Sequence, residues 1–263
     1  MIGILEAAAL EAGKAIMAVY AGDVAVSIKA DCSPVTEADG RAEAIILDHL
    51  AKAFPDIPVV AEEAVAAGSM PDIRGGRFFL VDPLDGTKEF IARNGDFTVN
   101  IALIEHGVPV AGVVYAPARG QGWSGTLDQG AAAFAVTEDF TIAARHAVKA
   151  RPSPQAPVAL VSRSHNSPET LAYLKTCCVG GERSIGSSLK FCLLAEGSAD
   201  LYPRFSRTME WDTAAGDAVL RAAGGMVSTV DGAPLTYGKP GFENPSFIAT
   251  GLSALGFTRQ SAT

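Results

Sequence analysis

Cysteine is scarce in this sequence and cations are outnumbered, and each shortage excludes a class of protein. The 4 cysteines are Cys32, Cys177, Cys178 and Cys192. Because they show no CxxC spacing, we expect neither a disulfide framework nor a zinc site, and a reducing compartment is the default. Lys and Arg total 21 against 29 Asp and Glu, which gives a net charge of −8. This balance argues against a nucleic-acid partner, whose binding needs a basic stripe.

The N-terminal stretch lacks the features of a secretory leader or a membrane span. No basic segment precedes its apolar residues, and Glu6, Glu11 and Lys14 interrupt them. A leader starts with a positively charged region, and a membrane helix needs about 20 mostly apolar residues. We therefore expect a cytoplasmic protein.

Motifs for covalent catalysis are also missing. There is no GxSxG string, and phosphate loops of the P-loop or dinucleotide type are not predicted. Ser164 and His165 are adjacent, but adjacency alone does not pair a nucleophile with its base. The sequence therefore gives little support to nucleophilic catalysis.

Hydrophobic periodicity predicts an α+β first half. Helices are expected over residues 2–20 and from about 37 to 54, the second after a turn at residues 33–39. His106 and Gly107 form a tight connection between two β-rich runs, which predicts a hairpin. Strands are predicted at residues 24–29, 58–61, 78–81, 97–105, 108–115 and near 121–136.

The composition changes at residues 147–157, where three prolines accompany Lys149 and Arg151. We place a domain boundary there, which gives an N-terminal domain over 1–150 and a C-terminal domain over 151–263. Beyond the boundary strands and helices alternate, which indicates an α/β second half. Strands are expected near residues 158–162, 178–184, 199–203, 226–230 and 246–250, and helices near 168–175, 187–196 and 212–223.

The string from Asp82 to Thr87 (DPLDGT) follows a short apolar run and is the most informative stretch. Pro83 forces a turn, so the carboxylates of Asp82 and Asp85 and the Leu84 carbonyl could converge. Converging oxygen ligands suit Mg²⁺. The backbone N–H groups of Gly86 and Thr87 and the Thr87 hydroxyl could then bind an anion at the start of a helix. The alternative is an ordinary Asx turn, since Asp and Gly dominate turns.

Acidic side chains stand at several predicted element ends, where each alone could be a solvated or capping acid. They are Asp39, Glu62, Asp82, Asp85 and Asp212. Gathered in one cleft they would repel one another unless cations lay among them, which favours a site for several Mg²⁺ ions. Such ions can bind a phosphate ester, activate water and stabilise the departing alkoxide. The Thr87 hydroxyl could orient that water.

Cations in the second half could bind the anionic groups of a substrate. Arg163 follows Ser162, Lys190 lies with Ser187 in the string from Gly186 to Lys190, and Arg204 comes near a predicted strand end. The alternative for Arg163 and Lys190 is solvated surface charge.

These strings resemble a known family. Residues 82–87 (DPLDGT) and 211–216 (WDTAAG) resemble the two signatures of the lithium-sensitive, Mg²⁺-dependent phosphatases related to inositol monophosphatase, and Glu62-Glu63 resembles a third element. Longer strings are similar to the bacterial 3'(2'),5'-bisphosphate nucleotidase branch. They are residues 84–90, 94–105, 162–165, 186–192 and 201–205.

The resemblance implies a layered α-β-α-β-α sandwich of the inositol monophosphatase and fructose bisphosphatase type, with the site between the domains. It implies Mg²⁺-dependent hydrolysis of 3'-phosphoadenosine 5'-phosphate to AMP and phosphate, a clearance step in sulfate assimilation. The implied metal ligands are Glu62, Asp82, the Leu84 carbonyl, Asp85 and Asp212. Thr87 with Glu62 would position water, Asp39 would hold a further ion through water, and Asp212 would lie near the leaving group. The substrate contacts would be Leu84, Asp85, Gly86, Thr87, Arg163, Ser187, Lys190, Arg204 and Asp212.

One departure bears on the substrate. The inositol branch commonly has an acid facing the sugar, about where this chain has Arg204. This favours a second phosphate, and inositol phosphates or fructose 1,6-bisphosphate are the alternative substrates. A non-catalytic nucleotide sensor would need a broken acid cluster. A structural scaffold would not need converging acids at all. Some bacterial members are loosely attached to the inner face of the membrane, although no anchor occurs here, and no protein partner is implied.

Overall fold

Helices α1 (Ile2–Tyr20) and α2 (Glu37–Ala53) pack against each other in the computed structural model. The structure describes residues 1–22, 26–28, 34–163 and 166–252. Leu5, Ala8 and Ile16 of α1 are fully buried and follow the helical spacing seen in the sequence. Both predicted helices are therefore confirmed. No helix in the described ranges is long and apolar enough to cross a bilayer.

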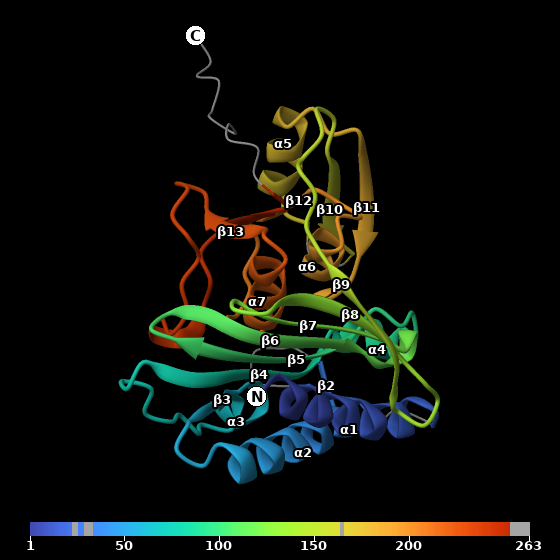
Figure 1. Cartoon of the computed structure of the whole chain (residues 1–263), viewed down its shortest axis with the longest axis vertical. Helices are drawn as coiled ribbons and strands as arrows, with labels where there is room; N and C mark the ends of the chain where they lie inside the picture. Colours follow the sequence, from blue (N-terminus) through green and yellow to red (C-terminus); the bar gives the residue numbers. More distant parts are fainter. Residues whose placement is uncertain (23–25, 29–33, 164–165, 253–263) are drawn as a thin grey trace.

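A seven-stranded sheet lies against these two helices (Figure 1). Its order is β3 (Val59–Ala61), β4 (Arg77–Asp85), β5 (Thr98–Glu105), β6 (Val108–Ala116), β7 (Gln121–Thr126), β8 (Gly130–Val136) and β9 (Ile142–Val148). Only β3 and β4 run parallel, and the β5–β6 pair confirms the expected hairpin. The edge strand β9 was not predicted, because its exposed residues show no alternation. Residues 120–125 have GxGxxG spacing, but all except Gly120 lie in β7, and the next element is the strand β8.

A five-stranded sheet forms from the second half of the chain. Its order is β11 (Gly181–Ile185), β10 (Val158–Ser162), β12 (Leu201–Arg204), β14 (Phe247–Thr250) and β13 (Met226–Thr229). β10 is parallel to both β11 and β12, whereas β14 is antiparallel to its neighbours. The helices α5 (Pro168–Thr176), α6 (Leu189–Ala195) and α7 (Ala214–Ala222) accompany this sheet. The predicted alternation of strand and helix is therefore confirmed.

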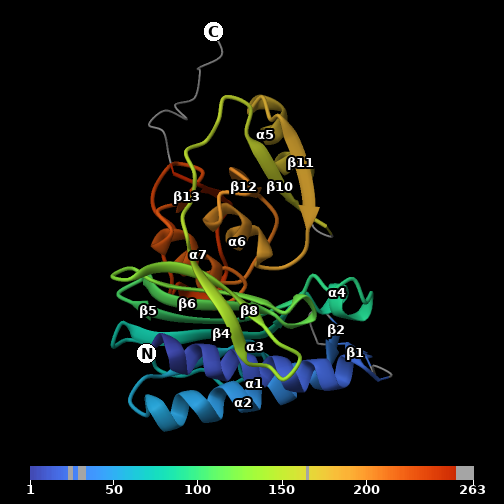
Figure 2. The ribbon, with the colours of Figure 1, turned by 45° about the vertical axis from the view of Figure 1, so that its right-hand side comes forward.

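Helices and sheets stack in alternating layers (Figure 2). α1 and α2 cover one face of the large sheet, and α7 packs on its other face against β5, β6 and β7. α6 contacts α7 and also reaches β12 and β14 of the small sheet. Leu174 of α5 packs with Ala159 and Leu201 on the outer face of that sheet. The expected α-β-α-β-α sandwich is confirmed.

The largest core cluster crosses the boundary placed at residue 150. It contains Leu80 and Trp123 of the large sheet together with Phe191, Val219 and Phe247 from the second half. The two halves therefore share buried surface, and their division into domains 1–150 and 151–263 stays a prediction.

Short elements complete the described chain. They are β1 (Val26–Ile28), β2 (Pro34–Thr36), α3 (Glu62–Ala66), α4 (Thr87–Ile91) and the 3₁₀ turns η1 (Pro117–Arg119) and η2 (Pro240–Phe242). β2 corrects the turn expected at residues 33–39, because Pro34 to Thr36 pair with β1. The ends of the strand predicted over 24–29 lie outside the described residues.

Candidate active site

The strand before the two signature aspartates runs further than the sequence predicts. β4 reaches Asp85, whereas the sequence predicts an end at Val81. The register shifts between Asp82 and Asp85, so two residues of β4 face one residue of β5. The Leu84 amide N–H donates to Asp82 Oδ1 at 3.0 Å. This β-bulge re-aims the side chains at the end of the strand.

Glu62 lies beside Asp82 because β3 and β4 are parallel neighbours. Ala61 pairs with Val81, and Glu62 then begins α3. Asp82 is only 2% exposed. Burial, followed by the charges of Glu62, Asp85 and Asp212, raises the pKa of Asp82 well above its usual range.

Asp85 contacts both halves of the chain. Its Oδ2 accepts from the Ser188 amide N–H at 2.6 Å and from Asn100 Nδ2 at 3.4 Å. Asn100 Nδ2 also donates to Ser188 Oγ at 2.9 Å. Burial raises the pKa of Asp85, although Lys190 and the Ser188 hydrogen bonds oppose this shift.

Asp212 lies in the turn before α7, whereas the sequence predicts a helix that starts there. The Met209 amide N–H donates to Asp212 Oδ2 at 2.9 Å, and Ser188 Oγ donates to the Asp212 carbonyl at 2.6 Å. Burial, followed by the charges of Asp85 and Glu62, raises the pKa of Asp212 to about 8. Glu62, Asp85 and Asp212 therefore act on one another electrostatically.

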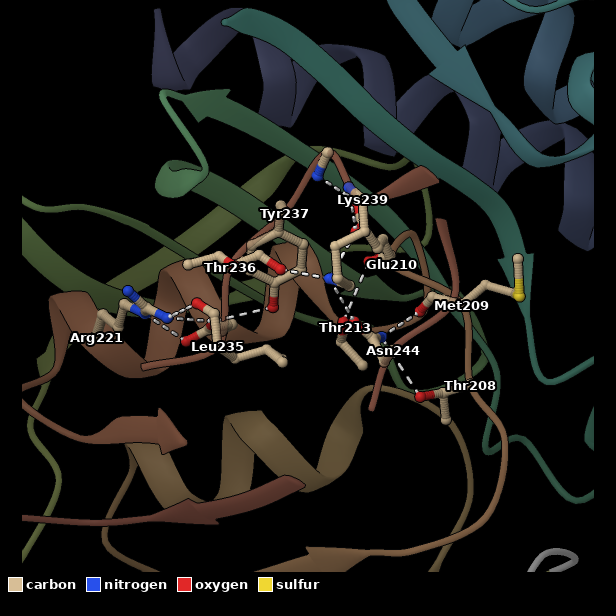
Figure 3. A network of polar contacts seen from close by, with 12 residues as sticks. Thr208, Met209, Glu210, Thr213, Arg221, Leu235, Thr236, Tyr237, Lys239 and Asn244 are labelled. Atoms are coloured by element: carbon tan, nitrogen blue, oxygen red, sulfur yellow. Dashed lines mark hydrogen bonds and ion pairs between the residues drawn. The ribbon is translucent and has the colours of Figure 1, made fainter. Parts of the chain in front are cut away.

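The segment that carries Asp212 is held by a buried polar network (Figure 3). Asn244 Nδ2 donates to the Met209 carbonyl at 2.8 Å, directly behind the amide that binds Asp212. Glu210, which is fully buried, accepts from the Lys239 amide N–H at 3.0 Å and pairs with Lys239 Nζ at 2.6 Å. Asn244 and Lys239 were not predicted as site residues, because they lie in a part of the sequence without a recognisable motif.

The Thr87 hydroxyl lies between two acceptors at the start of α4. Thr87 Oγ1 is 3.4 Å from Asp39 Oδ1 and 3.4 Å from the Leu84 carbonyl. Asp39 Oδ2 accepts from the Thr36 amide N–H at 2.9 Å, in a capping box that begins α2. One carboxylate oxygen of Asp39 therefore caps helix α2, and the other oxygen faces Thr87.

A pocket of about 340 Å³ opens between the two halves of the chain. That volume is in the range of small-molecule sites. Three of the acids border it, Glu62, Asp85 and Asp212. Its other lining residues include Gly86, Thr87, Lys88, Ser162, Ser187, Lys190, Tyr202, Arg204, Arg207, Thr208 and Thr213.

Lys190 is a buried cation of this pocket, with 3% exposure. Its Nζ donates to the Ser187 carbonyl at 2.6 Å and lies 5.2 Å from the centre of the Tyr202 ring. Burial lowers the pKa of Lys190 to about 8, although Asp85 opposes the shift. Ser187 has φ of 47°, and its buried Oγ has no hydrogen-bond partner in the described part of the chain.

Arg204 ends β12 and is 8% exposed. Its guanidinium donates to the Ser206 carbonyl at 3.2 Å and to the Arg207 carbonyl at 3.0 Å. Arg207 lines the same pocket. Lys190 and Arg204 are therefore both buried, so Lys190 is not the solvated surface charge that was its alternative interpretation.

Arg163 is placed differently from the other predicted substrate cations. Its Nη2 donates to Asp96 Oδ2 at 2.6 Å, and Arg163 is absent from the described residues that line the pocket. Its predicted substrate contact stays a prediction. Ser164 and His165, which follow it in the sequence, lie outside the described residues.

The donor set fits a hard divalent cation. Buried carboxylates that raise one another's pKa need positive charge among them in order to ionise together. Within the described ranges, no group of three or more acidic, histidine or cysteine side chains is placed to hold a metal ion by itself. Mg²⁺ commonly completes its shell with water and phosphate, and the acids at the pocket wall leave room for both. The predicted metal ligands stay predictions.

Two residues beside Asp85 were missed as site residues. Ser188 binds both Asp85 and the Asp212 backbone, and Asn100 binds Asp85 from the next strand. The string 186–192 and the polar Asn100 within an apolar strand were the available signals. Neither signal could reveal the partner, because the pairing depends on the fold.

Comparisons with known proteins identify the family of the chain. The inositol monophosphatase family matches residues 1–255 of the chain. The chain is similar to the 3'(2'),5'-bisphosphate nucleotidase CysQ of Escherichia coli strain K12, with 48% identity over 243 residues that cover 91% of this chain and 95% of the relative. It is also similar to the nucleotidase of that name from Salmonella typhimurium, with 46% identity over 92% of this chain and 96% of the relative.

Solved structures give the same result. The crystal structure of CysQ from Bacteroides thetaiotaomicron, a bacterial member of the inositol monophosphatase family, matches with a TM-score of 0.81 and 38% identity, over 95% of this chain and 96% of that one. The extragenic suppressor protein suhB from Bartonella henselae matches with a TM-score of 0.74 and 30% identity, over 95% and 93%.

Proposed function

The chain belongs to the inositol monophosphatase family, and we propose that it hydrolyses 3'-phosphoadenosine 5'-phosphate to AMP and inorganic phosphate. The observation that carries the proposal is one pocket that joins an acidic cluster to two buried cations, Lys190 and Arg204. The similarity to bisphosphate nucleotidases supports the same substrate. The reaction would clear a by-product of sulfate assimilation.

Mg²⁺ is the cofactor that we propose, with about two to three ions. When bound, it would hold phosphate oxygens, make water more nucleophilic and stabilise the leaving oxygen. Its ligands would be Glu62, Asp82, the Leu84 carbonyl, Asp85 and Asp212. Asp39 would hold a further ion through water.

Thr87 and Glu62 would orient the attacking water. The Thr87 hydroxyl lies 3.4 Å from Asp39 Oδ1, so it can donate a hydrogen bond to Asp39 and accept one from the attacking water. The water oxygen would bond to phosphorus while the bond from phosphorus to the 3' oxygen breaks. The 3' oxygen would leave near Asp212 and take up, through solvent, one proton of the attacking water to become the hydroxyl of AMP. The oxygen and the other proton of that water would stay with the inorganic phosphate.

The second phosphate would select the nucleotide. Residues 84–87 and the acids can handle one phosphate on almost any alcohol, so selection needs contacts at the far end of the substrate. Lys190, Arg204 and Ser187 line the pocket and would supply such contacts, and the Ser187 hydroxyl has no hydrogen-bond partner among the described residues. A charge-assisted contact contributes about 1.5–3 kcal/mol, or roughly ten- to a hundredfold in kcat/KM.

An inositol or sugar phosphatase remains the alternative within the same fold. The buried Arg204 at the pocket wall favours an additional anionic group over a neutral ring hydroxyl. Location in the cytoplasm, with or without peripheral attachment to the inner face of the membrane, stays a prediction.

Phosphate release from a substrate panel tests the proposed function. With Mg²⁺ present, 3'-phosphoadenosine 5'-phosphate should be preferred over 3'-AMP, and both over inositol 1-phosphate. Arg204→Ala should reduce the preference for the bisphosphate by roughly ten- to a hundredfold, because only that substrate uses the lost contact. Equal losses on both nucleotides would show that Arg204 acts elsewhere. A native preference for inositol 1-phosphate would overturn the assignment.

A further inference from the structure

Asp96 is a buried carboxylate outside the acidic cluster, in the loop between α4 and β5. Its side chain is 1% exposed. One oxygen pairs with Arg119, and the other accepts from Arg163 Nη2 at 2.6 Å and from the Gly186 amide N–H at 3.1 Å. Burial alone would raise the pKa of Asp96, but the hydrogen bonds from Arg163 and Arg119 lower it. The carboxylate is therefore charged and held from several directions.

The partners of Asp96 come from both halves of the chain. Arg119 ends η1 beside the large sheet, Arg163 follows β10 of the small sheet, and Gly186 follows β11. Both arginine side chains remain partly exposed, with 37% exposure for Arg119 and 45% for Arg163. We call these three charged side chains, Arg119, Asp96 and Arg163, the Asp96 clamp.

Close packing fixes the loops on both sides of Asp96. A Cβ atom at Gly86, which has φ of 94°, would lie 3.0 Å from the Asp96 carbonyl. A Cβ atom at Gly186 would lie 2.8 Å from the same carbonyl and 2.9 Å from Asp96 Cβ. Asp96 is therefore packed between Gly86, which follows β4, and Gly186, which lies in the loop that precedes α6.

The second of these loops carries groups of the active site. Two residues after Gly186, the Ser188 amide N–H donates to Asp85 at 2.6 Å. Ser187 between them lines the pocket, and its carbonyl accepts from Lys190 Nζ at 2.6 Å. A displacement of Gly186 would consequently shift the contacts of Asp85 and Lys190.

We infer that Asp96 is a positioning residue, and that Arg119 and Arg163 act on Asp96 and not on the substrate. The clamp holds the loop from Gly186 to Ser188 at the distance that Asp85 requires. This inference rests on the proposed function only for its substrate, because the contacts themselves do not depend on which phosphate ester is cleaved. It changes the role that the sequence suggests for Arg163, from phosphate ligand to clamp.

Selectivity separates the two roles of Arg163. In Arg163→Ala and Arg119→Ala, kcat/KM should fall by about ten- to a hundredfold on both 3'-phosphoadenosine 5'-phosphate and 3'-AMP, since loss of positioning affects both alike. The ratio between the substrates should stay unchanged, whereas Arg204→Ala should change it. If Arg163→Ala lowers the ratio as Arg204→Ala does and Arg119→Ala does not, Arg163 binds the substrate and the clamp is wrong.

Variants of Asp96 test whether the arginines act through it. Asp96→Asn keeps the shape and removes the charge, so adding Arg163→Ala to Asp96→Asn should lower kcat/KM little further. Arg163→Lys keeps a charge near Asp96 and should recover part of the activity lost in Arg163→Ala. Losses that simply add, with no recovery by lysine, would overturn the inference.

The same variants in urea unfolding give a measurement that needs no substrate. Asp96 should show coupling in unfolding free energy with Arg119 and with Arg163. If the wild-type protein cleaves neither nucleotide, the proposed function fails, and the kinetic comparison moves to whichever ester the panel identifies. Absent coupling would overturn the clamp even if the nucleotidase activity is confirmed.

Discussion

Lys190 carries its charge inside the protein, where burial opposes it. Its pKa is lowered to about 8, chiefly by burial and further by the neighbouring Arg204. Below that pH the side chain is an ammonium that can bind phosphate, and above it the amine is neutral. Lys190 is therefore still charged at neutral pH, but its pKa lies only slightly above that pH.

This margin gives a pH prediction. The value of kcat/KM for 3'-phosphoadenosine 5'-phosphate should fall as pH rises through about 8, because kcat/KM reports the free enzyme. The second pKa of a phosphate ester is about 6, so the substrate does not titrate in this range. Steady-state rates from about pH 7 to about pH 10 measure the fall, with Lys190→Met as the control. A fall of the same size in Lys190→Met would show that another group titrates.

At the residue scale, the sequence indicates which acids lie near one another, whereas their roles as metal ligands stay predictions. Asp82 and Asp85 could be found because one short motif carries both, and Glu62 because it follows a strand. The partner of Arg163 could not be found, since Asp96 lies 67 positions away in the chain. A cation's role depends on which anion lies nearest, and that is a property of the fold.

At the element scale, packing of α7 explains the last glycine of the WDTAAG string. A Cβ atom at Gly216 would lie 2.5 Å from the Phe191 ring of α6. α7 also approaches the large sheet closely, since a Cβ atom at Gly112 would lie 2.7 Å from the Ala215 carbonyl. α7 is therefore wedged between the large sheet and α6, directly after Asp212.

Gly216→Ala should consequently destabilise the protein by about 1–3 kcal/mol, as overpacking of a core does. Gly40→Ala is the matched control, because Gly40 also lies inside a helix but a Cβ atom added there would have nothing within 4 Å. It should stabilise the protein by up to about 1 kcal/mol. Urea unfolding of both variants measures the difference, and equal effects would contradict this account of α7.

Element types were predicted more reliably than element ends. The two N-terminal helices and the β5–β6 hairpin have strong periodicity, and the structure confirms them. The predicted end of β4 and the predicted start of α7 were wrong. A β-bulge extends β4 to Asp85, and a turn that the Met209 amide stabilises delays the start of α7. Both errors fall at the candidate site, where irregular backbone aims the side chains of Asp85 and Asp212.

For the whole molecule, the order of the layers was implied by the family resemblance, whereas the hydrophobic patterns gave only an α+β first half and an α/β second half. The shared core could not be derived, since α6 and α7 are short helices that fill the space between two sheets. Their position explains why the pocket draws residues from both halves. Asp85 from β4 and Ser188 from the loop before α6 meet there.

The central claim is that the buried acids work only with a divalent cation among them. Release of phosphate from 3'-phosphoadenosine 5'-phosphate, measured in EDTA and again after Mg²⁺ is restored, tests it most directly. We expect no turnover in EDTA and full recovery with Mg²⁺. Asp85→Asn, measured at saturating Mg²⁺, should lower kcat by at least about a hundredfold, the scale of losing one well-placed electrostatic group. Full activity in EDTA would contradict the account.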